Sequence, residues 1–131
     1  MTHTATGEFD VLLTPTGAPD AAVGSMAMRK TFHGGLSGTS SGQMLAVRTP
    51  VEGSAGYVAM ERVSGTLGGR TGTFALQHSG TMDRGAQSQS VTVVPDSATG
   101  ELSGLTGAME IRRGESGKHL YTFRYSLPVT P

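Results

Sequence analysis

The stretch from residue 55 to residue 80, AGYVAMERVSGTLGGRTGTFALQHSG, constrains the fold more than any other part of the chain. Two runs of residues that alternate at period two flank a glycine-rich centre, and this pattern predicts a β-hairpin. A two-residue loop, at Leu67-Gly68 or at Gly68-Gly69, pairs odd positions of the first strand with even positions of the second. A three-residue loop would reverse that relation.

The tight loop has a chemical consequence for one face of this hairpin. It places Glu61 on the same face as Phe74, Leu76 and His78. Because Phe74 and Leu76 are expected to belong to a core, the hairpin predicts a carboxylate and an imidazole among apolar side chains. We therefore take Glu61 and His78 as the candidate catalytic residues.

Two interpretations of this pair stay open at the level of the sequence. One is a structural ion pair or hydrogen-bonded pair near the rim, completed by Lys30 or Arg70. The other is an acid–base pair in an apolar pocket. Burial without a cation raises the pKa of a carboxyl group, which suits proton transfer, whereas a neighbouring cation lowers it. For Glu61 we expect the raised pKa.

The remaining chain shows the same period-two alternation between turn-rich connections. Further strands are expected over residues 5–14, 25–33, 42–49, 88–94, 101–112 and 118–127, with a polar loop over 79–87 and a bulge or bend within a long strand pair at 34–38. Lys30 falls on the apolar side of its strand, which is unusual unless it is paired or near a barrel mouth.

About eight such strands, with no convincing helix, fit a β-sandwich or an up-and-down barrel. The chain has too few large apolar residues for two thick layers. The sequence therefore favours an all-β fold, an eight-stranded antiparallel up-and-down β-barrel, whose interior is filled or holds one small ligand.

Composition limits the function classes. The 131 residues suffice for one domain, residues 1–131, and the formal net charge of zero argues against a nucleic-acid or polybasic membrane surface. The absence of cysteine excludes disulfides and thiolate metal sites. No signal peptide and no apolar run of membrane-spanning length are found, so we expect a cytoplasmic protein without membrane association.

Three motifs in the chain match catalytic or binding patterns only in part. Residues 38–42, GTSSG, match the Gly-x-Ser-x-Gly nucleophile elbow around Ser40, but a strand follows where that motif needs a helix. The glycines of residues 65–72 feed a strand and not the helix of a phosphate loop. The four histidines, His3, His33, His78 and His119, lack metal-ligand spacing. We expect no metal and no cofactor.

An aromatic row runs along one face of the last strand. It is most simply barrel core, and its functional interpretation is the wall of a pocket. The candidate ligand-binding residues are this row and its neighbours on the central hairpin, namely Tyr57, Phe74, Leu76, Tyr121, Phe123 and Tyr125. The seven methionines would suit an adaptable apolar lining, although they more often fill gaps.

Residues 56–82, GYVAMERVSGTLGGRTGTFALQHSGTM, residues 91–107, VTVVPDSATGELSGLTG, and residues 118–127, KHLYTFRYSL, resemble the bacterial family catalogued as domain of unknown function 3224. Where that family usually shows PGSGTGEL, this chain has Asp96 and Ala98 in place of two glycines. The resemblance implies an eight-stranded barrel similar to plant allene oxide cyclase. It implies no established activity, and no catalytic residue is carried over.

Three functions remain open, and whether the protein is an enzyme is left undecided. The first is a small barrel that binds an apolar small molecule in its lumen and acts as a cofactor-free isomerase or cyclase, with Glu61 as general base or anion and His78 as its partner. The analogy with small cyclase barrels favours this one. The second is a carrier or sensing barrel without chemistry. The third is a structural or interaction protein with a filled interior, assembled as a homo-oligomer.

Overall fold

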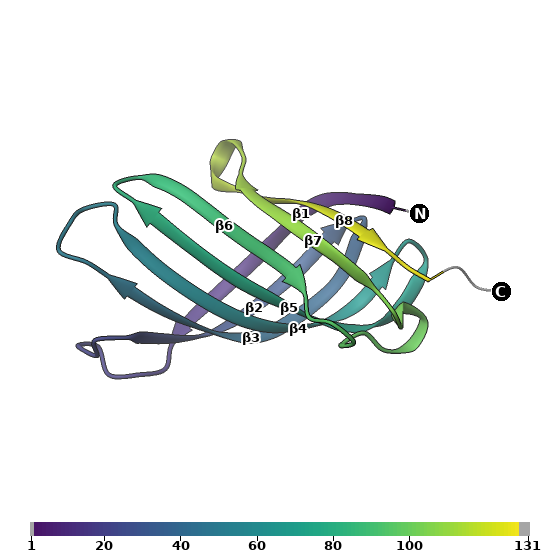
Figure 1. Ribbon diagram of the computed structural model, residues 1–131, viewed down its shortest axis with the longest axis horizontal. Helices are drawn as coiled ribbons and strands as arrows, with labels where there is room; N and C mark the ends of the chain where they lie inside the picture. The colour runs from purple at the N-terminus through teal and green to yellow at the C-terminus, as the bar shows by residue number, and fades with distance from the viewer. Residues whose placement is uncertain (1, 129–131) are drawn as a thin grey trace.

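The fold is a closed β-barrel of antiparallel strands in sequence order, seen in a computed structural model that describes residues 2–128 (Figure 1). Each strand pairs with the next, and β1 pairs with β8 to close the ring. The strands are β1 (Thr2–Pro15), β2 (Gly24–Gly34), β3 (Leu36–Arg48), β4 (Ala55–Leu67), β5 (Arg70–Asp83), β6 (Ala86–Val93), β7 (Thr106–Arg113) and β8 (His119–Ser126). The predicted eight-stranded all-β barrel is confirmed.

The central hairpin has the predicted register. Gly68 and Gly69 form a two-residue turn with φ of +58° and +82°, the left-handed conformation that such a turn needs at both positions. Glu61 pairs with Leu76, and Val63 pairs with Phe74. The alternate residues Val58, Met60 and Arg62 are exposed on the outside. The loop geometry therefore brings the carboxylate into the barrel.

Several strand boundaries differ from the predictions, and the third strand, predicted over residues 42–49, already begins at Leu36 as β3. The prediction of a polar loop over residues 79–87 is wrong, because β5 continues to Asp83 and β6 begins at Ala86. Its polar residues belong to strand ends at the barrel mouth, where both faces meet water. The seventh strand begins at Thr106 and not at residue 101, since Gly100–Leu102 form a short 3-10 helix, η1. The glycine pair Gly34-Gly35 is the turn between β2 and β3, not a bend within a strand pair.

One half of the barrel is filled by an apolar core. The side chains of Leu102 and Leu105, in the connection from β6 to β7, are at most 2% exposed and cover this end. Tyr121 ties its strand to the β2–β3 turn: its hydroxyl accepts a hydrogen bond from the Leu36 N–H at 2.9 Å. The other large residues of this closed core include Phe32, Leu67, Phe74, Leu76, Phe123 and Tyr125.

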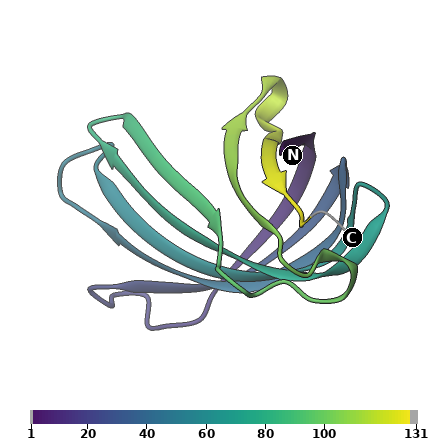
Figure 2. The same ribbon diagram turned by 45° about the vertical axis from the view of Figure 1, so that its right-hand side comes forward.

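The opposite end is open and its wall is incomplete. Strands β6 and β7 diverge toward this mouth (Figure 2). They are paired at Thr92 of β6 and Ala108 of β7. Gln89 spans the resulting seam. Its Nε2 donates to the Tyr57 hydroxyl at 3.3 Å, and its Oε1 accepts from the Ile111 N–H at 3.3 Å. A side-chain amide thus replaces the missing ladder bonds at this depth.

We predict that Asp96→Gly stabilises the protein by about 0.5–1 kcal/mol. Asp96 has φ of +61°, a left-handed conformation in which a Cβ atom is unfavourable and which glycine adopts without strain. Relief of that strain exceeds the added entropy of the unfolded chain. The measurement is the urea midpoint of both proteins. An unchanged or lower midpoint would mean that the Asp96 side chain itself holds the turn.

Candidate functional site

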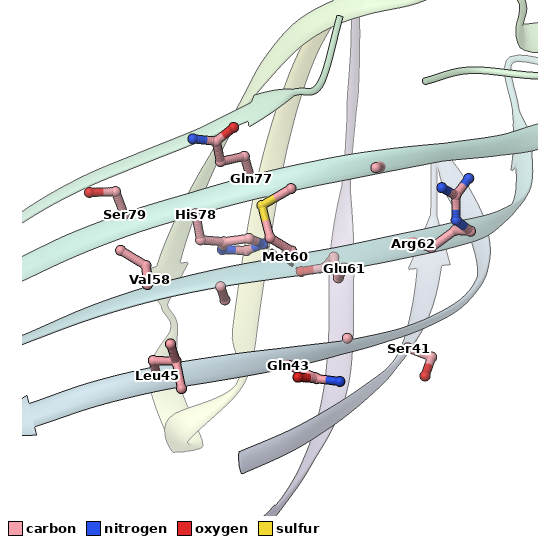
Figure 3. Close-up of a pocket in the computed structure, with 13 residues that line it drawn as sticks. Ser41, Gln43, Leu45, Val58, Met60, Glu61, Arg62, Gln77, His78 and Ser79 are labelled. Carbon is pink, nitrogen blue, oxygen red and sulfur yellow. Dashed lines mark hydrogen bonds and ion pairs between the residues drawn. The ribbon is translucent and has the colours of Figure 1, made fainter. Parts of the chain in front are cut away.

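A buried charged triad lies at mid-height in the barrel. Strands β2, β4 and β5 carry Lys30, Glu61 and His78 on their inward faces, where the three residues are 5%, 2% and 3% exposed. Lys30 Nζ lies 2.8 Å from Glu61 Oε2, and His78 Nε2 lies 2.5 Å from the same oxygen. Figure 3 shows Glu61 and His78 reaching toward each other across β4 and β5. The predicted pair is brought together, and Lys30 is its cation.

The two contacts decide the ionisation of Glu61. Burial alone would raise the pKa of its carboxyl group, but the hydrogen bond to His78 and the charge of Lys30 together outweigh burial and lower this pKa to about 2. The expected raised pKa is wrong, because the carboxylate is not alone. Arg70, the other candidate cation, is exposed at the start of β5 and makes no ion pair with Glu61 within residues 2–128.

The ionised carboxylate also sets the tautomer of His78. A carboxylate can only accept, so Nε2 of His78 carries the proton that it shares with Glu61. The described residues offer no hydrogen-bond partner to Nδ1 of this ring. A neutral His78 therefore presents Nδ1 as a free proton acceptor.

Two buried polar atoms near the triad lack a hydrogen-bond partner among residues 2–128. They are Oε1 of Glu61 and Oγ of Ser40, which faces Lys30 across β2 and β3. Ser40 lies inside strand β3, which no helix follows, so the nucleophile-elbow geometry is absent here. The second oxygen of Glu61 and the Ser40 hydroxyl each keep an unused hydrogen-bonding position.

Beside the triad, the open half of the barrel forms a cavity of about 470 Å³, here called the cup. Lys30 and His78 lie at its inner end, where Lys30 Nζ also stands 4.6 Å from the centre of the Phe9 ring. Glu61 does not line the cup and lies behind these two residues. The apolar lining includes Val11, Leu13, Met26, Met28, Met44, Ala46, Tyr57 and Met82.

The predicted ligand-binding residues divide between the two halves of the barrel. Tyr57 lines the cup. The other five, Phe74, Leu76, Tyr121, Phe123 and Tyr125, are buried in the closed core and none of them lines the cup. The sequence suggested a methionine lining in general terms but did not single out Met26, Met28, Met44 and Met82, and it did not place His119 in the cavity.

A second hollow, of about 690 Å³, lies on the outer face of β3, β4 and β5 (Figure 3). Its lining includes the exposed apolar side chains Leu45, Val58 and Met60. Glu61 and His78 touch it only from the inward side of the sheet, so their carboxylate and ring belong to the barrel interior. The outer hollow therefore brings no buried ionisable group to a ligand.

The histidines lie apart from one another. His3 packs on Tyr125 and His119 on Phe9, whereas His33 is hydrogen-bonded to Asp10 and His78 to Glu61. Across residues 2–128, no three side chains of the histidine, cysteine, aspartate and glutamate types gather as a metal ion would require. Within the same residues, no helix has the length and apolar character to cross a membrane.

The comparison with known proteins places the chain in a family. The model of the family described as "Protein of unknown function (DUF3224)" matches residues 5–125. The chain belongs to the DUF3224 family. A crystal structure of a DUF3224 protein of unknown function from Shewanella oneidensis MR-1 is 46% identical, with a TM-score of 0.92, and the match covers 99% of this chain and 100% of that one. No curated protein matches. The allene oxide cyclase-like relationship stays a prediction.

Proposed function

We propose that this DUF3224 barrel binds an apolar small molecule in the cup. The observation that carries the proposal is the unfilled half of the lumen, a cavity of about 470 Å³ beside a closed core. Small-molecule sites typically measure about 300–1,000 Å³ and combine an apolar wall with a few polar groups at one end. The cup has this composition, with methionines on its wall and Lys30 and His78 at its inner end.

The methionine wall supports a flexible fit to an irregular apolar body. Met26, Met28, Met44 and Met82 come from three different strands, so the wall can adapt by side-chain rotation without movement of the backbone. A structural protein with a filled interior is disfavoured by the same cavity.

A cofactor-free isomerase or cyclase is the second candidate, and the position of His78 favours it. His78 lines the cup and is oriented by Glu61, whose low pKa makes it a poor base but a stable anion beside the ring. In this reaction class His78 would move the proton through Nδ1, and Glu61 would be a positioning residue. The test is an activity whose rate follows the titration of one group and is lost in His78→Gln while ligand binding persists.

The binding proposal predicts a difference between two neighbouring substitutions on β3. Ala46 lines the cup, whereas Leu45 points outward and is 48% exposed. Ala46→Trp should fill the cup and reduce the affinity for 1-aminoanthracene, a neutral apolar fluorophore, by about tenfold or more. Leu45→Trp should leave that affinity unchanged.

Fluorescence titration at pH 7 measures both affinities, and thermal melts confirm that both variants are folded. The proposal fails if the wild type shows no saturable binding of the fluorophore. It also fails if the two tryptophan variants lose affinity equally, because the fluorophore would then be bound on the outer surface.

A further inference from the structure

The charges that line the cup all have one sign. Its basic residues are Lys30, His78 and His119 inside and Arg48, Arg112 and Arg113 toward the mouth. The chain as a whole carries ten acidic and ten basic residues, yet none of the acidic residues lines the cup. Acidic and basic residues are therefore balanced over the whole chain, but only basic ones line the cup.

The cations at the two ends of the cup differ in their pairing. Lys30 is neutralised by Glu61 at 2.8 Å. Among residues 2–128, the three mouth arginines have no carboxylate within ion-pair distance. Arg48 and Arg113 stand at strand ends on the inward parity of β3 and β7, at the rim of the cavity. The uncompensated positive charge is therefore at the mouth.

His119 also lines the cup, and its pKa is lowered. Burial, with Arg113 and Lys30, lowers the pKa of His119 below its ordinary value, and the opposing effect of Asp10 does not cancel this. His119 stacks on Phe9 with 5.1 Å between ring centres, so its position is fixed by packing. His119 therefore lies on the wall of the cup directly across from Arg113, close to the rim arginines.

We infer that the natural ligand of the cup is an amphiphilic anion, with an apolar body against the methionine wall and an anionic head at the rim arginines. This inference rests on the proposed binding function and names its ligand class. A guanidinium presents paired N–H donors that match carboxylate, sulfate and phosphate oxygens, and it loses less hydration than an ammonium on binding. The head stays near water at the mouth, while the body displaces water from the apolar lining.

The test compares three probes with the same ten-carbon chain and different heads: decanoate, decanol and decyltrimethylammonium. Each displaces 1-aminoanthracene from the wild-type protein at pH 7, below its micelle concentration. We expect decanoate to bind about tenfold tighter than decanol, and the cation to bind more weakly than decanol. The advantage of decanoate should shrink as sodium chloride is raised.

The variant pair separates the rim from general surface charge. Arg48→Gln combined with Arg113→Gln should remove the advantage of decanoate and leave the affinity for decanol unchanged. The matched control, Arg29→Gln combined with Arg62→Gln, removes two charges from exposed positions outside the cup and should change neither affinity. Decanoate should also raise the pKa of His119, followed by the NMR shift of its ring protons.

The outcomes distinguish this inference from the proposed function. If the fluorophore binds in the cup but decanoate and decanol bind equally, the cup is an apolar site and the inference is wrong. If decanoate is preferred equally in the rim variant and in the wild type, the arginines do not recognise the head and the inference is also wrong. Absence of fluorophore binding in the wild type would instead reject the proposed function.

Discussion

Replacement of Glu61 by glutamine is expected to lower the free energy of unfolding by about 3–5 kcal/mol at pH 7. The carboxylate is the counter-ion of Lys30 and the acceptor of the His78 proton. Glutamine keeps the shape of the side chain but leaves the ammonium group buried without a charge partner. Urea denaturation of the wild type and of Glu61→Gln measures the loss.

The loss should disappear on acidification. The folded-state pKa of Glu61, about 2, lies below the ordinary glutamate value of 4.5, so ionisation of this group stabilises the folded state above the unfolded pKa. That contribution, about 3 kcal/mol, falls as the pH drops from about 4.5 toward about 2. Most of the difference between wild type and Glu61→Gln should therefore persist at pH 4 and be small at pH 2.

A double variant provides the control for this prediction. Lys30→Met removes the stranded ammonium and, in the Glu61→Gln background, should recover a large part of the lost stability. A Glu61→Gln protein that is as stable as the wild type at pH 7 would contradict the ion pair. It would restore the alternative in which the carboxyl group is protonated and available as an acid.

Truncation of Phe123 to alanine is expected to cost about 3–5 kcal/mol. The Phe123 side chain is fully buried and packs between Phe74, with 5.9 Å between ring centres, and Tyr125, with 5.3 Å. The closed core around it cannot collapse easily, because its neighbours are held by the barrel hydrogen bonds on all sides. The measurement is the urea midpoint and slope of both proteins.

Met44→Ala is the matched control for the core truncation. Met44 lies on an inward face like Phe123, but it borders the cup, so its removal enlarges an existing space and creates no new void. The decrease in the free energy of unfolding for Met44→Ala should be less than half of the decrease for Phe123→Ala. Equal losses would mean that the cup is closed and packed in solution, which would also remove the basis for a ligand in it.

Much of the fold could be predicted from the sequence because it depends on local rules. Alternation of side chains at period two determined the strands, and the Gly68-Gly69 turn determined which face of β4 meets which face of β5. The inward positions of Glu61, Phe74, Leu76 and Phe123 followed from parity alone. Several strand boundaries at both ends of the barrel did not, because the polar and small residues at the strand ends hide the alternation.

The partner of Glu61 could not be predicted with the same certainty. Lys30 stands 31 positions earlier in the chain and two strands away, since β3 lies between β2 and β4. The sequence placed Lys30 on the apolar face of its strand and left both Lys30 and Arg70 as candidate cations for Glu61. The choice depends on the stagger of neighbouring strands, which is set by the closure of the whole barrel.

By itself the sequence determined the fold class, the register of the central hairpin and the presence of a buried carboxylate beside an imidazole. Only the tertiary structure decided the pKa of that carboxylate, and it also divided the lumen into a core and a cup. The reason is physical: a pKa depends on charges within a few ångströms, and an empty space depends on how all the strands close. The leucines of the β6–β7 connection fill one end, and nothing comparable fills the end beside Lys30 and His78 among residues 2–128.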